Sequence, residues 1–129
     1  MDELTHVPAG SLRGSTAQTA GMARSAAIDG ATVGSRALWM GETRVAPGVA
    51  SAPHHHGESE TAIYVVAGHP VFAFRRGDEV VRLATAPGDY VYVPAWVPHV
   101  EENPSADTEA TVVIARTTQE AIAVEVETL

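Results

Sequence analysis

The sequence contains no cysteine and no lysine, and all eight of its basic residues are arginine. Without cysteine there is neither a disulfide framework nor a thiolate metal site. Without lysine, Schiff-base chemistry and the lysine that grips phosphate in a P-loop are excluded. Sixteen acidic residues give a formal net charge of −8, and such a charge repels phosphate backbones and anionic lipid. Nucleic acid and membrane surfaces are therefore not expected partners.

Long apolar runs are also missing, since no stretch approaches the roughly 18 uninterrupted apolar residues of a membrane span. The N-terminal residues Met-Asp-Glu-Leu-Thr-His lack both the basic start and the apolar run of a signal peptide. We therefore expect a cytoplasmic protein.

Turn residues, in contrast, are frequent, with 11 Gly and 8 Pro spread over 129 residues. No segment shows helical spacing of apolar residues over three turns. Short apolar stretches between these turns predict about nine or ten strands, and hence an all-β fold that is a closed barrel or a two-sheet jelly roll. We expect residues 35–129 to form this β-barrel and residues 1–34, with one strand near 23–28, to form an N-terminal arm.

The histidines are clustered. His54, His55 and His56 are consecutive, and His99 lies far downstream in a stretch flanked by proline. Side chains alternate between the two faces of a strand, so His54 and His56 share a face that His55 does not. Two neutral imidazoles on one strand face can begin a site for Zn, Fe, Mn, Ni or Cu. The alternative is an ordinary histidine run on the surface.

Two spaced patterns surround these histidines. In the first, Gly48 is followed by five residues and then by His54 and His56, with Glu60 and Gly68 further on. In the second, Gly88, Pro94, His99 and Asn103 occur in that order.

These patterns resemble the two motifs of the cupin superfamily, and the resemblance extends over residues 36–116. The second pattern matches the cupin motif at every interval, except that Trp96 stands where the family has glycine. The resemblance implies a double-stranded β-helix, that is, a jelly-roll barrel.

The carboxylate of the first motif is ambiguous. Glu60 has the expected spacing from His56, but seven residues separate it from Gly68 where the family has six. Counting back from Gly68 gives Thr61 instead. If Thr61 faces inward, Glu60 turns away unless a bulge intervenes. The fourth position is therefore either Glu60 or, in a three-histidine site, Thr61.

The resemblance implies one divalent transition metal per subunit, held at the barrel mouth by His54, His56, Glu60 and His99. Cupin chemistry at such a metal favours a dioxygenase-like oxidoreductase. Arg75, Arg76 and Arg82 are the only arginines between the motifs and belong to one hairpin, so we expect a small, weakly charged, partly aromatic or enol-type substrate. The alternatives are a non-catalytic binding module and a metal-dependent isomerase or cyclase.

Further residues are candidates for the pocket. Glu101 lies two positions after His99 and faces the same side of a continuous strand, so we predict a catalytic role for it; the alternative is that the strand has reached solvent there. Four large side chains are predicted to line the substrate pocket: Trp96, Phe72, Tyr92 and Met40.

We also expect a two-fold homodimer. The N-terminal residues are small and weakly charged but include apolar anchors such as Met22 and Ile28. Small cupins commonly dimerise with N-terminal strands that cross to the partner. Part of residues 15–34 is therefore predicted to contact the other subunit.

Overall fold

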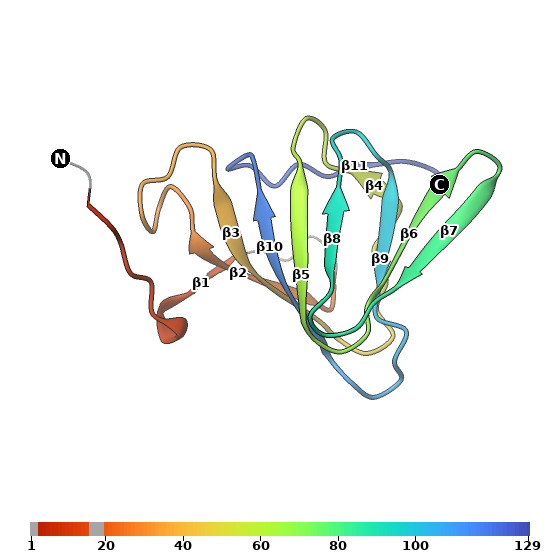
Figure 1. Ribbon diagram of the computed structural model, residues 1–129, viewed down its shortest axis with the longest axis horizontal. Coiled ribbons are helices and arrows are strands. Elements are labelled where there is room, and N and C mark those ends of the chain that lie inside the picture. Colours follow the sequence, from red (N-terminus) through yellow and green to blue (C-terminus); the bar gives the residue numbers. More distant parts are fainter. Residues whose placement is uncertain (1–2, 16–19) are drawn as a thin grey trace.

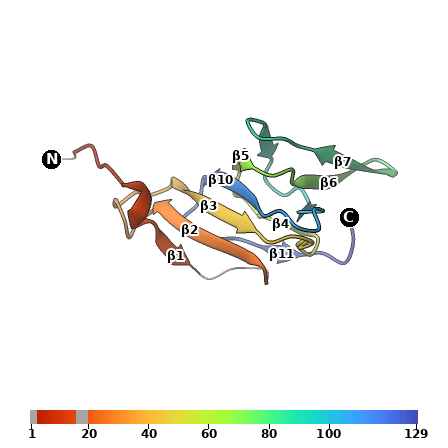
Figure 2. The same cartoon turned by 90° about the horizontal axis from the view of Figure 1, so that it is seen from below.

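The computed structural model describes residues 3–15 and 20–129. It is an all-β structure of two antiparallel sheets, seen from two directions in Figures 1 and 2, and the all-β, jelly-roll prediction is confirmed. Only a short 3-10 turn, η1 (Ala9–Ser11), precedes the strands, and no helix among the described residues is long and apolar enough to span a membrane.

The larger sheet has six strands in the order β1-β2-β3-β10-β5-β8. Their bounds are β1 (Arg13–Ser15), β2 (Met22–Ile28), β3 (Trp39–Val45), β10 (Ala110–Arg116), β5 (Thr61–Ala67) and β8 (Tyr90–Val93). The smaller sheet has five strands in the order β11-β4-β9-β6-β7. Their bounds are β11 (Val124–Glu125), β4 (His54–His55), β9 (His99–Glu102), β6 (Val71–Arg76) and β7 (Glu79–Ala84).

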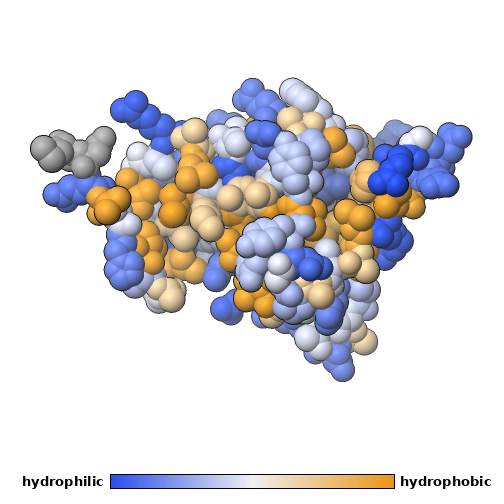
Figure 3. Space-filling view, in the orientation of Figure 1, coloured by the Kyte–Doolittle hydropathy of each residue, from blue (hydrophilic) through white to orange (hydrophobic). Residues whose placement is uncertain are grey.

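The six-stranded sheet follows the two-residue period of a half-buried strand closely. In β3 and β10 every second residue is buried, as are the first, third and fifth residues of β5, and Ile63, Val65 and Val112 are at most 2 % exposed. These inward side chains form the core between the sheets. The surface drawn in Figure 3 mixes apolar and polar side chains, as a sheet with one solvated face requires.

The N-terminal residues take part in the large sheet of their own chain. The strand predicted near 23–28 is β2, and it pairs with β3 from Met22 to Ile28. Strand β1 then pairs with β2 and extends the sheet further, as Figure 2 shows. Contact of residues 15–34 with a second subunit stays a prediction.

Several motif residues hold the backbone in place. Gly68 ends β5 with φ +81°, and a Cβ there would lie 2.8 Å from the Cα of Ala110. Asn103 is 1 % exposed and its amide donates hydrogen bonds to the carbonyls of Val45 and Thr108. Trp96, at the usual glycine position, has φ +69° and therefore carries backbone strain that glycine would avoid.

Candidate metal centre

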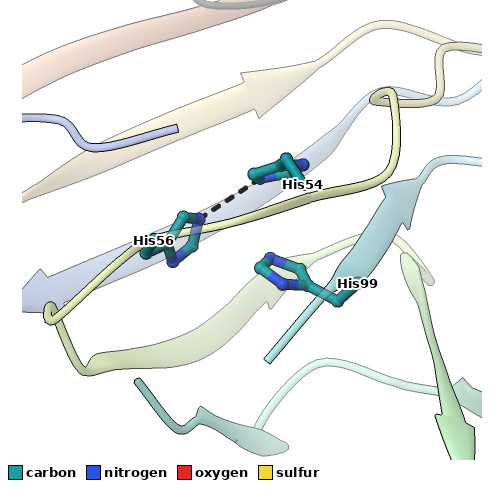
Figure 4. Close-up of side chains that lie close together, drawn as sticks. All are labelled: His54, His56 and His99. Atoms are coloured by element: carbon teal, nitrogen blue, oxygen red, sulfur yellow. Dashed lines mark hydrogen bonds between the residues drawn. The ribbon is translucent and has the colours of Figure 1, made fainter. Parts of the chain in front are cut away.

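Three histidines from two neighbouring strands meet inside the barrel (Figure 4). His54 lies on β4, His56 follows just after that strand, and His99 begins β9, where it is the cross-strand partner of His54. Three ring nitrogens, one from each of these histidines, lie within 4.8 Å of one another. The structure thus brings His99, from the second motif, to the two histidines that alternation placed on one strand face.

Backbone carbonyls orient two of the rings. The Nδ1 atoms of His54 and His99 lie 2.7 Å and 3.0 Å from the carbonyl oxygens of Ala52 and Val97. A carbonyl oxygen only accepts, so each Nδ1 carries the proton and each Nε2 presents its lone pair to the centre of the site. Metal-binding imidazoles are commonly held in this way.

The third ring completes the group. The Nδ1 of His56 lies 3.0 Å from the hydroxyl of Thr61, and its Nε2 lies 3.2 Å from the Nε2 of His54. Two nitrogens bound to one metal at about 2.1 Å each would be separated by roughly 3.0–3.4 Å. The Nε2 of His99 is buried and has no hydrogen-bond partner. This donor set therefore fits a transition metal that accepts neutral imidazole.

Electrostatics keep two of these imidazoles neutral. Burial lowers the pKa of His54, and burial together with the neighbouring His99 lowers the pKa of His56 to about 4. His99 differs, because burial opposes its charge but the Glu101 carboxylate outweighs burial and raises its pKa. Near neutral pH, two of the three ligands are thus free of competing protons.

Glu101 faces the histidines, on the same side of β9 as His99. Its side chain is 15 % exposed, and its Oε1 lies 3.7 Å from the Nε2 of His99, beyond hydrogen-bond range. Burial disfavours its ionised form, yet the neighbouring His99, followed by His54 and His56, outweighs burial and lowers the pKa of Glu101. It is therefore an ionised carboxylate beside the candidate metal position.

Glu60 and Thr61, the two candidates for the fourth ligand position, point in different directions. Thr61 is 3 % exposed and points inward with Ile63 and Val65, because β5 alternates regularly from its first residue. Glu60 precedes the strand, is exposed, and accepts a hydrogen bond of 2.5 Å from the hydroxyl of Tyr92. The structure thus places Thr61 beside His56 and Glu60 outside the histidine group.

The four large side chains predicted for the pocket lie in different places. Phe72 is 4 % exposed and belongs to the core. Tyr92 and Met40 are 60 % and 36 % exposed, on the outer face of the large sheet. Trp96 is 64 % exposed, and its ring centroid lies 5.8 Å from that of His55.

The cavity beside the histidines has a volume of about 70 Å³ and a wall of both polar and apolar side chains. Besides His54 and His56, its wall includes Glu101 and two arginines, Arg24 and Arg116. Sequence reasoning missed both arginines because it considered only those between the motifs. A signal was available: Arg24 shares its strand face with Met22 and Ala26, which are buried.

His99 borders a second, larger cavity of about 420 Å³. Its wall contains Leu83, Val91 and Val97, together with Phe72 and Tyr92, two of the side chains predicted to line the substrate pocket.

Comparisons with known proteins agree with this architecture. The family model described as "Cupin domain" matches residues 41–115, which is more than half of the chain. No match was found among curated proteins.

Solved structures match over most of the chain. The polyketide cyclase RemF from Streptomyces resistomycificus has a TM-score of 0.75 at 18 % identity, over 98 % of this chain and 86 % of the cyclase. An oxalate oxidase in complex with glycolate has a TM-score of 0.70 at 22 % identity, over 88 % of this chain and 59 % of the oxidase. Oxalate decarboxylase from Bacillus subtilis has a TM-score of 0.70 at 18 % identity, over 84 % of this chain and 28 % of the decarboxylase. At these identities the matches establish the fold.

Proposed function

The chain belongs to the cupin family, and from this premise we propose that it is a metal-dependent enzyme acting on a small molecule, with His54, His56 and His99 as metal ligands. The observation that carries the proposal is the meeting of these three imidazoles in a partly enclosed site with their Nδ1 atoms already engaged. When bound, a metal of this kind supplies Lewis acidity and, if redox-active, electrons for chemistry with O₂.

A dioxygenase-like oxidoreductase is the first candidate. Thr61 is a weak ligand and Glu60 lies outside the group, so the protein leaves coordination positions for a substrate. Glu101 can accept a proton at Oε1 from a substrate hydroxyl or enol, because its carboxylate is ionised and adjacent to the histidines.

A redox-neutral cyclase or isomerase is the second candidate. One observation favours it: the polyketide cyclase and this chain match over nearly their whole lengths. The same residues would serve, with Glu101 moving a proton and no electron transfer required. A cupin that binds a ligand without turnover is the remaining outcome of the experiment below.

Metal analysis of the purified protein tests the metal site. We expect close to one transition metal per chain in the unmodified protein and in His55→Ala, and strong depletion in His99→Ala. His55 is the matched control, since it lies in the same histidine run but points toward Trp96. Full metal loading of His99→Ala would contradict the assignment of the site.

Oxygen uptake then separates the candidate activities. The protein is loaded anaerobically with Fe(II) and offered O₂ with a panel of small enols, diols and hydroxy acids. Substrate-dependent uptake supports the oxidoreductase, whereas conversion of a substrate without uptake supports the cyclase or isomerase. Metal binding with no conversion of any compound would favour the binding module.

A further inference from the structure

Two arginines line the cavity beside the histidines, although the protein is acidic. They are Arg24 on β2 and Arg116 on β10, two of the chain's eight arginines. The acids in its wall are Glu101, which is largely buried, and Glu125, which is exposed on β11. The wall therefore carries as many positive as negative charges, while the chain as a whole has a formal charge of −8.

Arg116 is held rigidly. Its Nε and Nη2 donate to the carbonyls of Thr118 and Gln119, and its guanidinium carbon lies 4.0 Å from the ring centroid of Trp39. Burial, followed by the positive charge of Arg24, lowers the pKa of Arg116 to about 10, so it remains charged at neutral pH. A fixed guanidinium loses little entropy when it binds an anion.

Arg24 connects this charge to the histidines. It shares the inward face of β2 with Met22 and Ala26, and it lines the same cavity as His54 and His56. Its positive charge reaches both histidines and contributes to lowering each of their pKa values. Two like charges confined in one cavity repel each other, so an anion bound there would relieve the repulsion.

The volume of the cavity limits the size of the ligand. About 70 Å³ holds several water-sized groups, each needing roughly 10–15 Å³. A sugar phosphate or a large aromatic ring does not fit in that space, whereas a carboxylic acid of two to four carbons does.

We propose that this cavity binds a small carboxylate, whose anionic end is recognised by Arg24 and Arg116 while its other end reaches His54, His56 and His99. The inference rests on the proposed function, because it names the substrate class of the same site. A planar carboxylate matches the fork of guanidinium donors. It replaces the weakly charged aromatic substrate expected from the arginines between the motifs alone.

Binding of glycolate and of its neutral isostere glycolamide tests the proposal. Titration calorimetry is carried out on the protein loaded with Zn²⁺ and on the metal-free protein. We expect glycolate to bind at least tenfold more tightly than glycolamide to the loaded protein. Inorganic phosphate, which carries more charge, is expected to bind more weakly than glycolate because Glu101 repels the second charge.

Substitutions test whether the arginines cause the preference for glycolate over glycolamide. Arg24→Gln is expected to weaken glycolate binding at least tenfold and to leave glycolamide binding and zinc content unchanged, and Arg24→Lys to have an intermediate effect. Arg44→Gln is the matched control, since it removes the same charge from an exposed position on the neighbouring strand β3 and should alter none of these values.

The outcomes separate this inference from the proposed function. If the protein binds zinc but has equal affinity for glycolate and glycolamide, the carboxylate assignment is wrong and the metal site stands. The same conclusion holds if the protein binds zinc and a folded Arg24→Gln variant binds glycolate as tightly as the unmodified protein. Phosphate binding as tightly as glycolate would also overturn the carboxylate assignment. Conversely, a protein that takes up no metal but still prefers glycolate through Arg24 would refute the proposed function and support the carboxylate site.

Discussion

In the six-stranded sheet, the inward side chains of β3 and β10, and of β5 as far as Val65, are buried in strict alternation. In the five-stranded sheet, β7 is exposed almost throughout, and the inward residues of β4 and β9 are His54, His99 and Glu101. The main core cluster among the described residues has eight members, and Phe72 is the one that comes from the smaller sheet. The remaining seven are Ala26, Trp39, Ile63, Val65, Val93, Val112 and Ile114.

This contrast shows how a small barrel can separate stability from chemistry. Apolar burial in the large sheet supplies the free energy of folding, so the small sheet can present polar ligands. The separation is incomplete, since Arg24 and Arg116 reach the site from the large sheet. Substitutions in the two sheets should therefore affect different measurements.

The largest effect is expected on metal affinity when a ligand in the small sheet is removed. Structural zinc sites in zinc-finger peptides bind with about 10–16 kcal/mol, and on that scale the loss of one ligand from a set of three or four weakens binding on the order of a thousandfold. We expect this for His99→Ala in a competition titration with a chelator. The unfolding free energy of the metal-free variant should change far less, and an unfolded variant would contradict the separation.

The next largest effect is expected on stability when the core of the large sheet is truncated. Ile63 is 1 % exposed, so Ile63→Ala should lower the free energy of unfolding by about 2–5 kcal/mol in a denaturant titration. Leu83→Ala, in the exposed strand β7 and at 39 % exposure, should cost below about 1 kcal/mol. Equal losses in the two variants would remove the distinction between the sheets.

A smaller effect concerns the pH dependence of metal binding, because protons compete with metal for imidazole. The pKa of His99 is raised above 6.5, so metal affinity should begin to fall as the pH drops through this raised pKa. One proton competes with the metal in this range, so the affinity should fall about tenfold per pH unit. The pKa of His56 is lowered to about 4, so its proton competes only in strong acid. Dissociation constants measured from pH 8 to 5 check this, and a three-proton slope that begins near pH 6.5 would contradict it.

The smallest effect is expected at Glu60. Because this side chain is exposed and bonded to Tyr92, Glu60→Gln should change metal affinity less than about twofold. Calorimetric titration of the metal-free protein measures this. A drop of tenfold or more would show that Glu60 is a ligand despite its position outside the histidine group.

The sequence by itself determined the all-β class, the cupin family and the three histidines, since strand alternation and motif spacing are local properties of the chain. The inward side of Glu101 also followed from its distance of two residues from His99. Tertiary structure decided which of Glu60 and Thr61 faces the site, because that depends on where β5 begins its regular pairing with β8. Only the tertiary structure brought Arg24 and Arg116 to one cavity. These arginines lie on separate strands, β2 and β10, with β3 between them in the sheet. The distance between them is therefore set by the pairing of these three strands and by the curvature of the sheet.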